Sequence, residues 1–107
     1  MARTLTPVEP DAAARLLEEG ALLVDVREVD EYGRGQIPGS RNVPLSRIAH
    51  SELPLAAGQA VVFLCASGTR TNVYAPMLAE KAGSAAAYVL RGGLSAWARA
   101  GLSVERG

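Results

Sequence analysis

The chain has 107 residues, of which 49% are hydrophobic and 21% charged, and this is the size and balance of one soluble domain, expected over residues 1–107. Eleven basic side chains balance eleven acidic ones, which excludes the positive field of a general nucleic-acid or membrane-surface binder. A single cysteine excludes internal disulfides and multi-thiolate metal cages, so we expect no metal and no organic cofactor.

The N-terminal third predicts a strand, a helix and a buried strand. A short extended segment is expected at 4–6, and Pro10 suits the first turn of a helix that ends at Gly20. Residues 21–26 form an almost continuous apolar run, which is typical of a strand covered on both faces. Prolines and acidic residues also interrupt the first twenty residues, so we expect no signal peptide and no membrane anchor. The lone thiol suits a reducing compartment, so we expect a cytoplasmic protein.

The middle of the chain is predicted to be mostly loop before a second buried strand. Residues 29–33 are short and acidic, and 35–44 contain two prolines and two glycines around a brief extended piece at 41–43. Residues 45–49 suit one or two helical turns. The apolar run 60–64 then predicts a strand that is followed directly by Cys65.

The C-terminal third predicts a helix, a strand and a second helix. Residues 69–81 have helical spacing, with Val73, Tyr74, Met77 and Leu78 on one apolar face. Pro76 conflicts with a continuous helix because it lacks a backbone donor. A strand at 86–90 and a helix at 94–100 follow. The alternation of strands and helices predicts an α/β sandwich with a largely parallel sheet, which binds ligands beyond the carboxyl ends of its strands.

Cys65 lies where a buried strand turns into a helix. Free backbone N–H groups and about half a positive charge gather at a helix N-terminus, and such surroundings lower a thiol pKa from about 8.5 to about 3.5–7.5. Gly68 can adopt a positive φ and turn N–H groups inward, while Arg70 adds a cation that can bind an oxyanion. A lone cysteine is usually inert core filling, but this loop favours a nucleophile that solvent can reach.

Four ordered segments resemble the rhodanese-like domains, also called thiosulfate sulfurtransferase-like. The first two contain Val24, Asp25, Val26, Arg27 and Glu28, then Glu31, Tyr32, Gly35, Ile37, Pro38, Gly39, Ser40, Asn42, Val43 and Pro44. The others contain Cys65, Ser67, Gly68 and Arg70, then Leu90, Gly92, Gly93 and Trp97. The resemblance implies a three-layer sandwich whose five-stranded parallel sheet is flanked by helices, with the active loop after the fourth strand.

By this resemblance, Cys65 takes sulfane sulfur from a small donor such as thiosulfate, holds it as a persulfide and delivers it to a thiol or cyanide. A protein thiol is a further candidate acceptor. The backbone of Ala66, Ser67, Gly68, Thr69 and Arg70 would bind the substrate, and Arg70 would orient an anionic donor. Asp25 and Arg27 resemble scaffold residues, and Gln36 stands where the family most often has histidine. A monomer or weak dimer is expected, with no nucleic-acid or membrane partner.

Two alternatives stay open. A sulfur-relay or sensor module would accept persulfide from a partner with little turnover, and a cysteine-based phosphatase or arsenate reductase would use the same thiolate. The four residues between Cys65 and Arg70 resemble the sulfurtransferase loop, whereas the phosphatases and arsenate reductases carry five. Outside the loop, His50 is expected to be exposed, the acidic run Glu28–Glu31 to begin a helix, and Trp97 and Tyr88 to lie in the core or at its rim.

Overall fold

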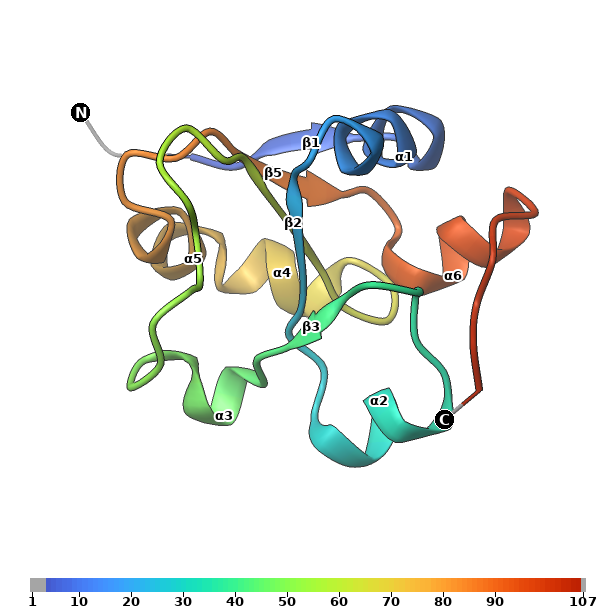
Figure 1. Ribbon diagram of the computed structural model, residues 1–107. Helices are drawn as coiled ribbons and strands as arrows, with labels where there is room; N and C mark the ends of the chain where they lie inside the picture. The colour runs from blue at the N-terminus through green and yellow to red at the C-terminus, as the bar shows by residue number, and fades with distance from the viewer. Residues whose placement is uncertain (1–3, 107) are drawn as a thin grey trace.

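The computed structural model describes residues 4–106, which form a parallel sheet with helices on both sides (Figure 1). The strands are β1 (Thr6–Val8), β2 (Leu22–Asp25), β3 (Arg41–Asn42), β4 (Val61–Leu64) and β5 (Ala87–Leu90), in the sheet order β1-β5-β4-β2-β3. The helices are α1 (Pro10–Glu18), α2 (Val29–Arg34), α3 (Leu45–Ile48), α4 (Thr69–Val73), α5 (Ala75–Lys81) and α6 (Gly93–Arg99). All four strand pairs are parallel, so the predicted fold class is confirmed.

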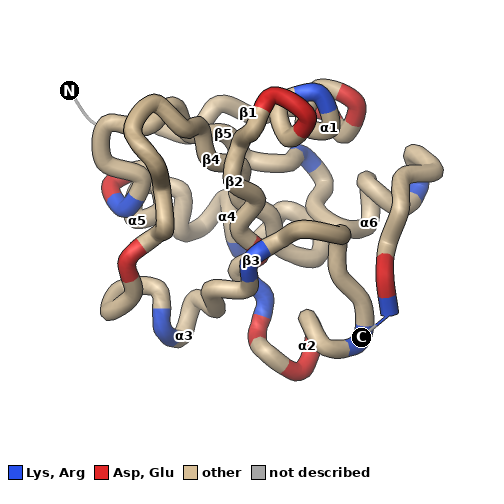
Figure 2. Tube along the Cα trace, in the orientation of Figure 1, with Lys and Arg blue, Asp and Glu red and all other residues tan. Residues whose placement is uncertain are grey.

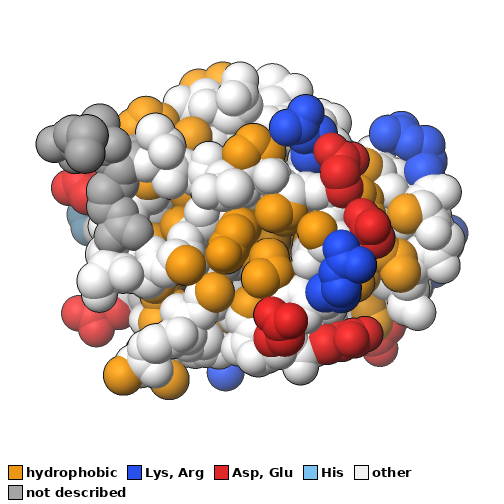
Figure 3. Space-filling view, turned by 90° about the horizontal axis from the view of Figure 1, so that it is seen from above, with side chains coloured by type: hydrophobic (Ala, Val, Ile, Leu, Met, Phe, Trp, Pro, Cys, Tyr) orange, Lys and Arg blue, Asp and Glu red, His pale blue; other side chains and the backbone are white. Residues whose placement is uncertain are grey.

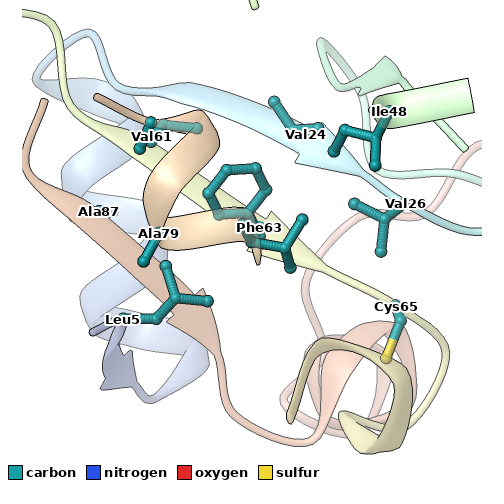
Figure 4. Close-up of a cluster of buried hydrophobic side chains, with 11 residues drawn as sticks. Leu5, Val24, Val26, Ile48, Val61, Phe63, Cys65, Ala79 and Ala87 are labelled. Carbon is teal, nitrogen blue, oxygen red and sulfur yellow. The ribbon is translucent and has the colours of Figure 1, made fainter. Parts of the chain in front are cut away.

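Strand β4 occupies the centre of the sheet and is buried on both faces. Alternate side chains of a strand point to opposite faces, so Val61, Phe63 and Cys65 join a core cluster with residues of α3 and α5 (Figure 4). Val62 and Leu64 pack on the other face, in a cluster that includes residues of α1 and α6. This double covering explains why the run is apolar without alternation.

The expected helix over 69–81 is two helices. Helix α4 ends at Val73, Tyr74 lies between the two, and α5 begins at Ala75 with Pro76 in its first turn. A proline is tolerated there because the N–H groups of a first turn have no intrahelical acceptor. The predicted apolar face is therefore wrong in part: Leu78 is buried, but Val73 is 65% exposed and Tyr74 46%.

Other elements differ at their ends or in type. The segment expected to be loop at 29–33 forms α2, where the side chain of Glu28 accepts from the backbone N–H of Glu31 and that of Glu31 from the N–H of Glu28. This capping box confirms that the acidic run begins a helix. Strand β1 starts at Thr6 instead of Thr4 and pairs with β5.

Charged residues lie mainly on the helices and connecting loops (Figure 2). On the face seen in Figure 3, they border a central group of hydrophobic side chains. None of the helices within residues 4–106 is long and apolar enough to cross a bilayer. In the same residues, no group of three or more histidine, cysteine or acidic side chains is gathered as metal ligands would be.

Candidate active site around Cys65

Cys65 directly follows β4, and its sulfur points toward the loop that leads into α4 (Figure 4). The backbone N–H of Gly68 donates to Sγ over 3.1 Å, and the Thr71 hydroxyl lies 3.6 Å from Sγ. Gly68 has a φ of +95°, in the left-handed region that favours glycine. The turn that the sequence predicts at Gly68 therefore directs a backbone donor at the sulfur.

The surroundings of the Cys65 thiol act on its pKa in opposite directions. Burial raises it, whereas hydrogen bonds from the backbone and hydroxyl of Thr71 and from the backbone N–H groups of Gly68 and Ser67 lower it. The hydrogen bonds outweigh burial, so the pKa lies below that of an ordinary cysteine. Because α4 has only five residues, we attribute this shift to these nearby donors and not to the dipole of a long helix.

Access to the thiol differs from the sequence expectation. Cys65 is 1% exposed, whereas Ser67 and Thr69 above it are exposed. The prediction of a thiol open to solvent is wrong for this conformation, because the sulfur belongs to the core cluster at the end of β4. A reagent reaches Sγ only after the loop moves.

The start of α6 holds the other side of the loop. The N–H groups of Leu94 and Ser95 donate to the carbonyls of Cys65 and Ala66 over 2.9 and 3.0 Å. Gly93 has a φ of +60°, and a Cβ there would lie 2.4 Å from the Cys65 carbonyl oxygen. This close approach requires glycine.

Arg70 is paired with a carboxylate of α2. Its two terminal nitrogens donate to the two oxygens of Glu31 over 2.7 and 2.9 Å. The hydrogen bonds from Arg70 lower the pKa of Glu31 to about 2, against the raising effect of burial. Glu31 in turn raises the pKa of Arg70, and the nearby Cys65 contributes in the same direction. The cation is thus largely neutralised by Glu31, while it still stands within electrostatic range of the sulfur.

Asp25 and Arg27 form a second, buried pair at the carboxyl end of β2. Asp25 is fully buried, Arg27 is 5% exposed, and the shortest contact between their charged groups is 2.8 Å. The Arg27 guanidinium also donates to the carbonyls of Glu31 and Gly35. These contacts fold the segment between β2 and α2 into the shape that brings Glu31 to Arg70.

Four other residues singled out in the sequence do not contribute to this cluster. Gln36 pairs through its backbone with Glu105 near the C-terminus, and its buried Oε1 has no hydrogen-bond partner in residues 4–106. Within the same residues, no hydrogen bond joins the Gln36 side chain to Cys65. His50 lies exposed after α3, as expected. Trp97 is buried and Tyr88 half-buried in the core, which confirms their assignment.

Sequence reasoning missed two residues of the site. Thr71 is fully buried and contacts the sulfur, and Glu31 neutralises Arg70 from 39 residues away. The signal for Thr71 is its place in the first turn of α4, from which a side chain can reach back to the loop. The signal for Glu31 is weaker, since the carboxylates of Asp25, Glu28 and Asp30 precede it closely in the sequence.

The fold agrees with the comparisons to known proteins. The family model that matches, over residues 9–100, is that of the rhodanese-like domain. The chain belongs to the rhodanese-like domain family. A sulfurtransferase of Allochromatium vinosum is 35% identical to this rhodanese-like domain over 86 residues, which cover 80% of this chain and 79% of the relative.

Two further relatives are longer than this rhodanese-like domain. An uncharacterized protein of Synechocystis is 37% identical over 101 residues, which cover 94% of the chain but 56% of the relative. The crystal structure of a thiosulfate sulfurtransferase from Pseudomonas aeruginosa superposes with a TM-score of 0.81 at 28% identity, covering 96% of this chain and 20% of that one. The chain thus spans about half the length, or less, of these two proteins.

Proposed function

We propose that this domain is a sulfurtransferase that moves sulfane sulfur through a persulfide on Cys65. The observation that carries the proposal is the set of donors on Sγ, from Ser67, Gly68 and Thr71, which favours the ionised thiol despite burial. The sulfurtransferase relatives support the same chemistry. No metal or organic cofactor enters the proposed reaction.

The proposed reaction has two displacements. The Cys65 thiolate attacks the outer sulfur of thiosulfate, a Cys65 S–S bond forms, and sulfite leaves with the electron pair of the broken S–S bond. An acceptor thiolate, or cyanide, then attacks the outer sulfur of the persulfide, and the Cys65 thiolate is released. The backbone of residues 66–70 cradles the persulfide, and Arg70 orients the anionic donor. Separate donor and acceptor steps predict ping-pong kinetics.

Burial of the thiol sets a condition on this proposal. Since Cys65 is 1% exposed, residues 66–69 must move before a donor can reach the sulfur. The same burial favours the second candidate, a relay module whose loop opens on a partner protein that carries the persulfide. Turnover of thiosulfate without any partner separates the two candidates.

The decisive experiment is mass analysis of the intact chain after incubation with thiosulfate. We expect a gain of about 32 Da on Cys65, loss of that mass on addition of cyanide with formation of thiocyanate, and no gain in Cys65→Ser. A gain from a protein persulfide but not from thiosulfate supports the relay module instead. An unmodified Cys65 with every donor contradicts both candidates. Release of phosphate from an aryl phosphate would indicate the phosphatase alternative.

A further inference from the structure

A groove of about 530 Å³ lies beside the Cys65 loop. It is bordered by Ser67, Gly68 and Thr71, the residues whose polar groups contact Sγ. The groove therefore shares its wall with residues that contact the sulfur. Its volume is in the range of small-molecule sites.

The lining of this groove combines hydrophobic residues with the uncharged polar residues Ser67, Thr69, Thr71 and Asn72 and includes Arg91. Its hydrophobic residues come from the N-terminal segment, α4, α5 and β5, namely Leu5, Pro7, Val73, Ala75, Val89 and Leu90. The charged residue in the lining is Arg91, whose Nε lies 3.1 Å from a carboxylate oxygen of Glu9. Arg70 is paired with Glu31 and is not among the residues that line the groove.

An anionic substrate gains little from such a groove, whereas an uncharged carbon chain gains from leaving water. Val73 is an apolar side chain that a bound carbon chain could cover, because it is 65% exposed and forms part of the groove wall. A thiol that attacks a Cys65 persulfide must place its sulfur at the loop and the rest of its structure beside it.

We propose that this groove binds the organic part of the acceptor, and that the preferred acceptor is a small thiol with an uncharged alkyl or aryl group. The inference rests on the proposed function, because it assigns the second of its two displacements. In that step the acceptor thiolate forms a bond to the outer persulfide sulfur, and the Cys65 thiolate leaves.

The test uses the chain with its persulfide already formed, so that the donor step does not enter the measurement. Transfer to straight-chain alkanethiols from methanethiol to butanethiol is followed by loss of about 32 Da from Cys65. Burial of each methylene is worth about 0.8 kcal/mol, so the second-order rate constant is expected to rise up to about fourfold per methylene. An anionic thiol of similar length, 2-mercaptoethanesulfonate, is expected to react more slowly than propanethiol.

Two exposed valines give a matched pair of variants. Val73→Asp places a charge in the groove and is expected to remove most of the chain-length dependence, whereas Val29→Asp, at a valine that is 56% exposed and outside the groove lining, leaves it unchanged. Equal rates along the series, or a Val73→Asp variant that keeps the dependence, overturn the groove proposal while the persulfide still supports the proposed function. Absence of the persulfide overturns both.

Discussion

The hydroxyl of Thr71 has one proton and two neighbours that can accept it. It donates to the Gly68 carbonyl over 3.1 Å, and it lies 3.6 Å from Sγ of Cys65. When Cys65 is ionised, a hydrogen bond to the sulfur becomes more favourable than one to a neutral carbonyl. Thr71 therefore positions the loop around a neutral thiol and stabilises the thiolate.

Replacing Thr71 by valine is expected to raise the pKa of Cys65. A hydrogen bond to a charged group is worth about 1.5–3 kcal/mol, which corresponds to a rise of about one to two units. Titration followed by the ultraviolet absorbance of the thiolate measures it without the need for a reagent to enter the loop.

Two further substitutions serve as controls for Thr71. Thr71→Ser keeps the hydroxyl and should keep a low thiol pKa. Thr69→Val removes an exposed hydroxyl that contacts Ser67 Oγ and not the sulfur, so the pKa should not move. A pKa in Thr71→Val equal to that of the parent chain would contradict the role of the hydroxyl.

The position and backbone conformation of single residues were predictable where the neighbouring sequence determines them. Cys65 after an apolar run and Gly68 at a positive φ follow from the sequence around them. The burial of Cys65 does not, because it depends on a core cluster that residues from distant parts of the chain complete. The ion-pair partner of Arg70 could not be predicted either, because it lies in a distant segment. Several carboxylates in the sequence could equally have formed the pair.

Helix α6 stabilises the loop through its first residues, and Gly93 is the point of closest approach. Gly93→Ala is expected to lower the free energy of unfolding by more than about 2 kcal/mol, since positive φ strains alanine and its Cβ would collide with the Cys65 carbonyl. Urea denaturation measures the loss. Gly101→Ala is the control, because Gly101 has a φ of +81° but open space around it, and should lose only about 1–2 kcal/mol. Equal losses would show that the contact with the loop contributes nothing.

The Glu31–Arg70 pair joins α2 to α4, and its contribution should depend on pH. The pKa of Glu31 is lowered from 4.5 to about 2 by folding, so the carboxylate stabilises the fold above pH 4.5 and the gain is lost as the pH falls toward 2. Glu31→Gln is expected to lower the free energy of unfolding by about 0.2–1 kcal/mol at pH 7, and the difference from the parent should vanish toward pH 2.

Asp30→Asn is the matched control for Glu31→Gln, because Asp30 lies 3.7 Å from Arg34 with both side chains more than 70% exposed. Little change is expected at any pH. A pH-independent difference for Glu31→Gln would show that the effect comes from packing and not from the ion pair.

Helices and strands were predictable where a single pattern of apolar residues runs through the whole element. The buried strands and α1 follow from apolar patterns. Helices α4 and α5 were predicted as one because the spacing continues across Tyr74, although Pro76 marks the break. Only the start of helix α2 was predictable, from its acidic run, because the helix is stabilised by polar and capping interactions and has no buried residue that would give an apolar pattern.

At the scale of the whole molecule, the buried Asp25–Arg27 pair joins the sheet to the segment around the site. Asp25 registers with Leu64 of β4 and Asn42 of β3, so it lies where three strands end beside Cys65. Its partner Arg27 is 5% exposed and also holds two carbonyls of the α2 segment. Removing one charge of such a pair leaves the other buried without compensation, which costs about 3–5 kcal/mol.

Asp25→Asn is therefore expected to lower the free energy of unfolding by about 3 kcal/mol or more, measured by urea denaturation of the parent and the variant side by side. Asp11→Asn changes an exposed carboxylate that lies 3.9 Å from Arg15 and should stay within about 0.5 kcal/mol of the parent. If Asp25→Asn is as stable as Asp11→Asn, the Arg27 charge is solvated by other groups. The carboxyl ends of β2, β3 and β4 would then be held by the apolar core alone.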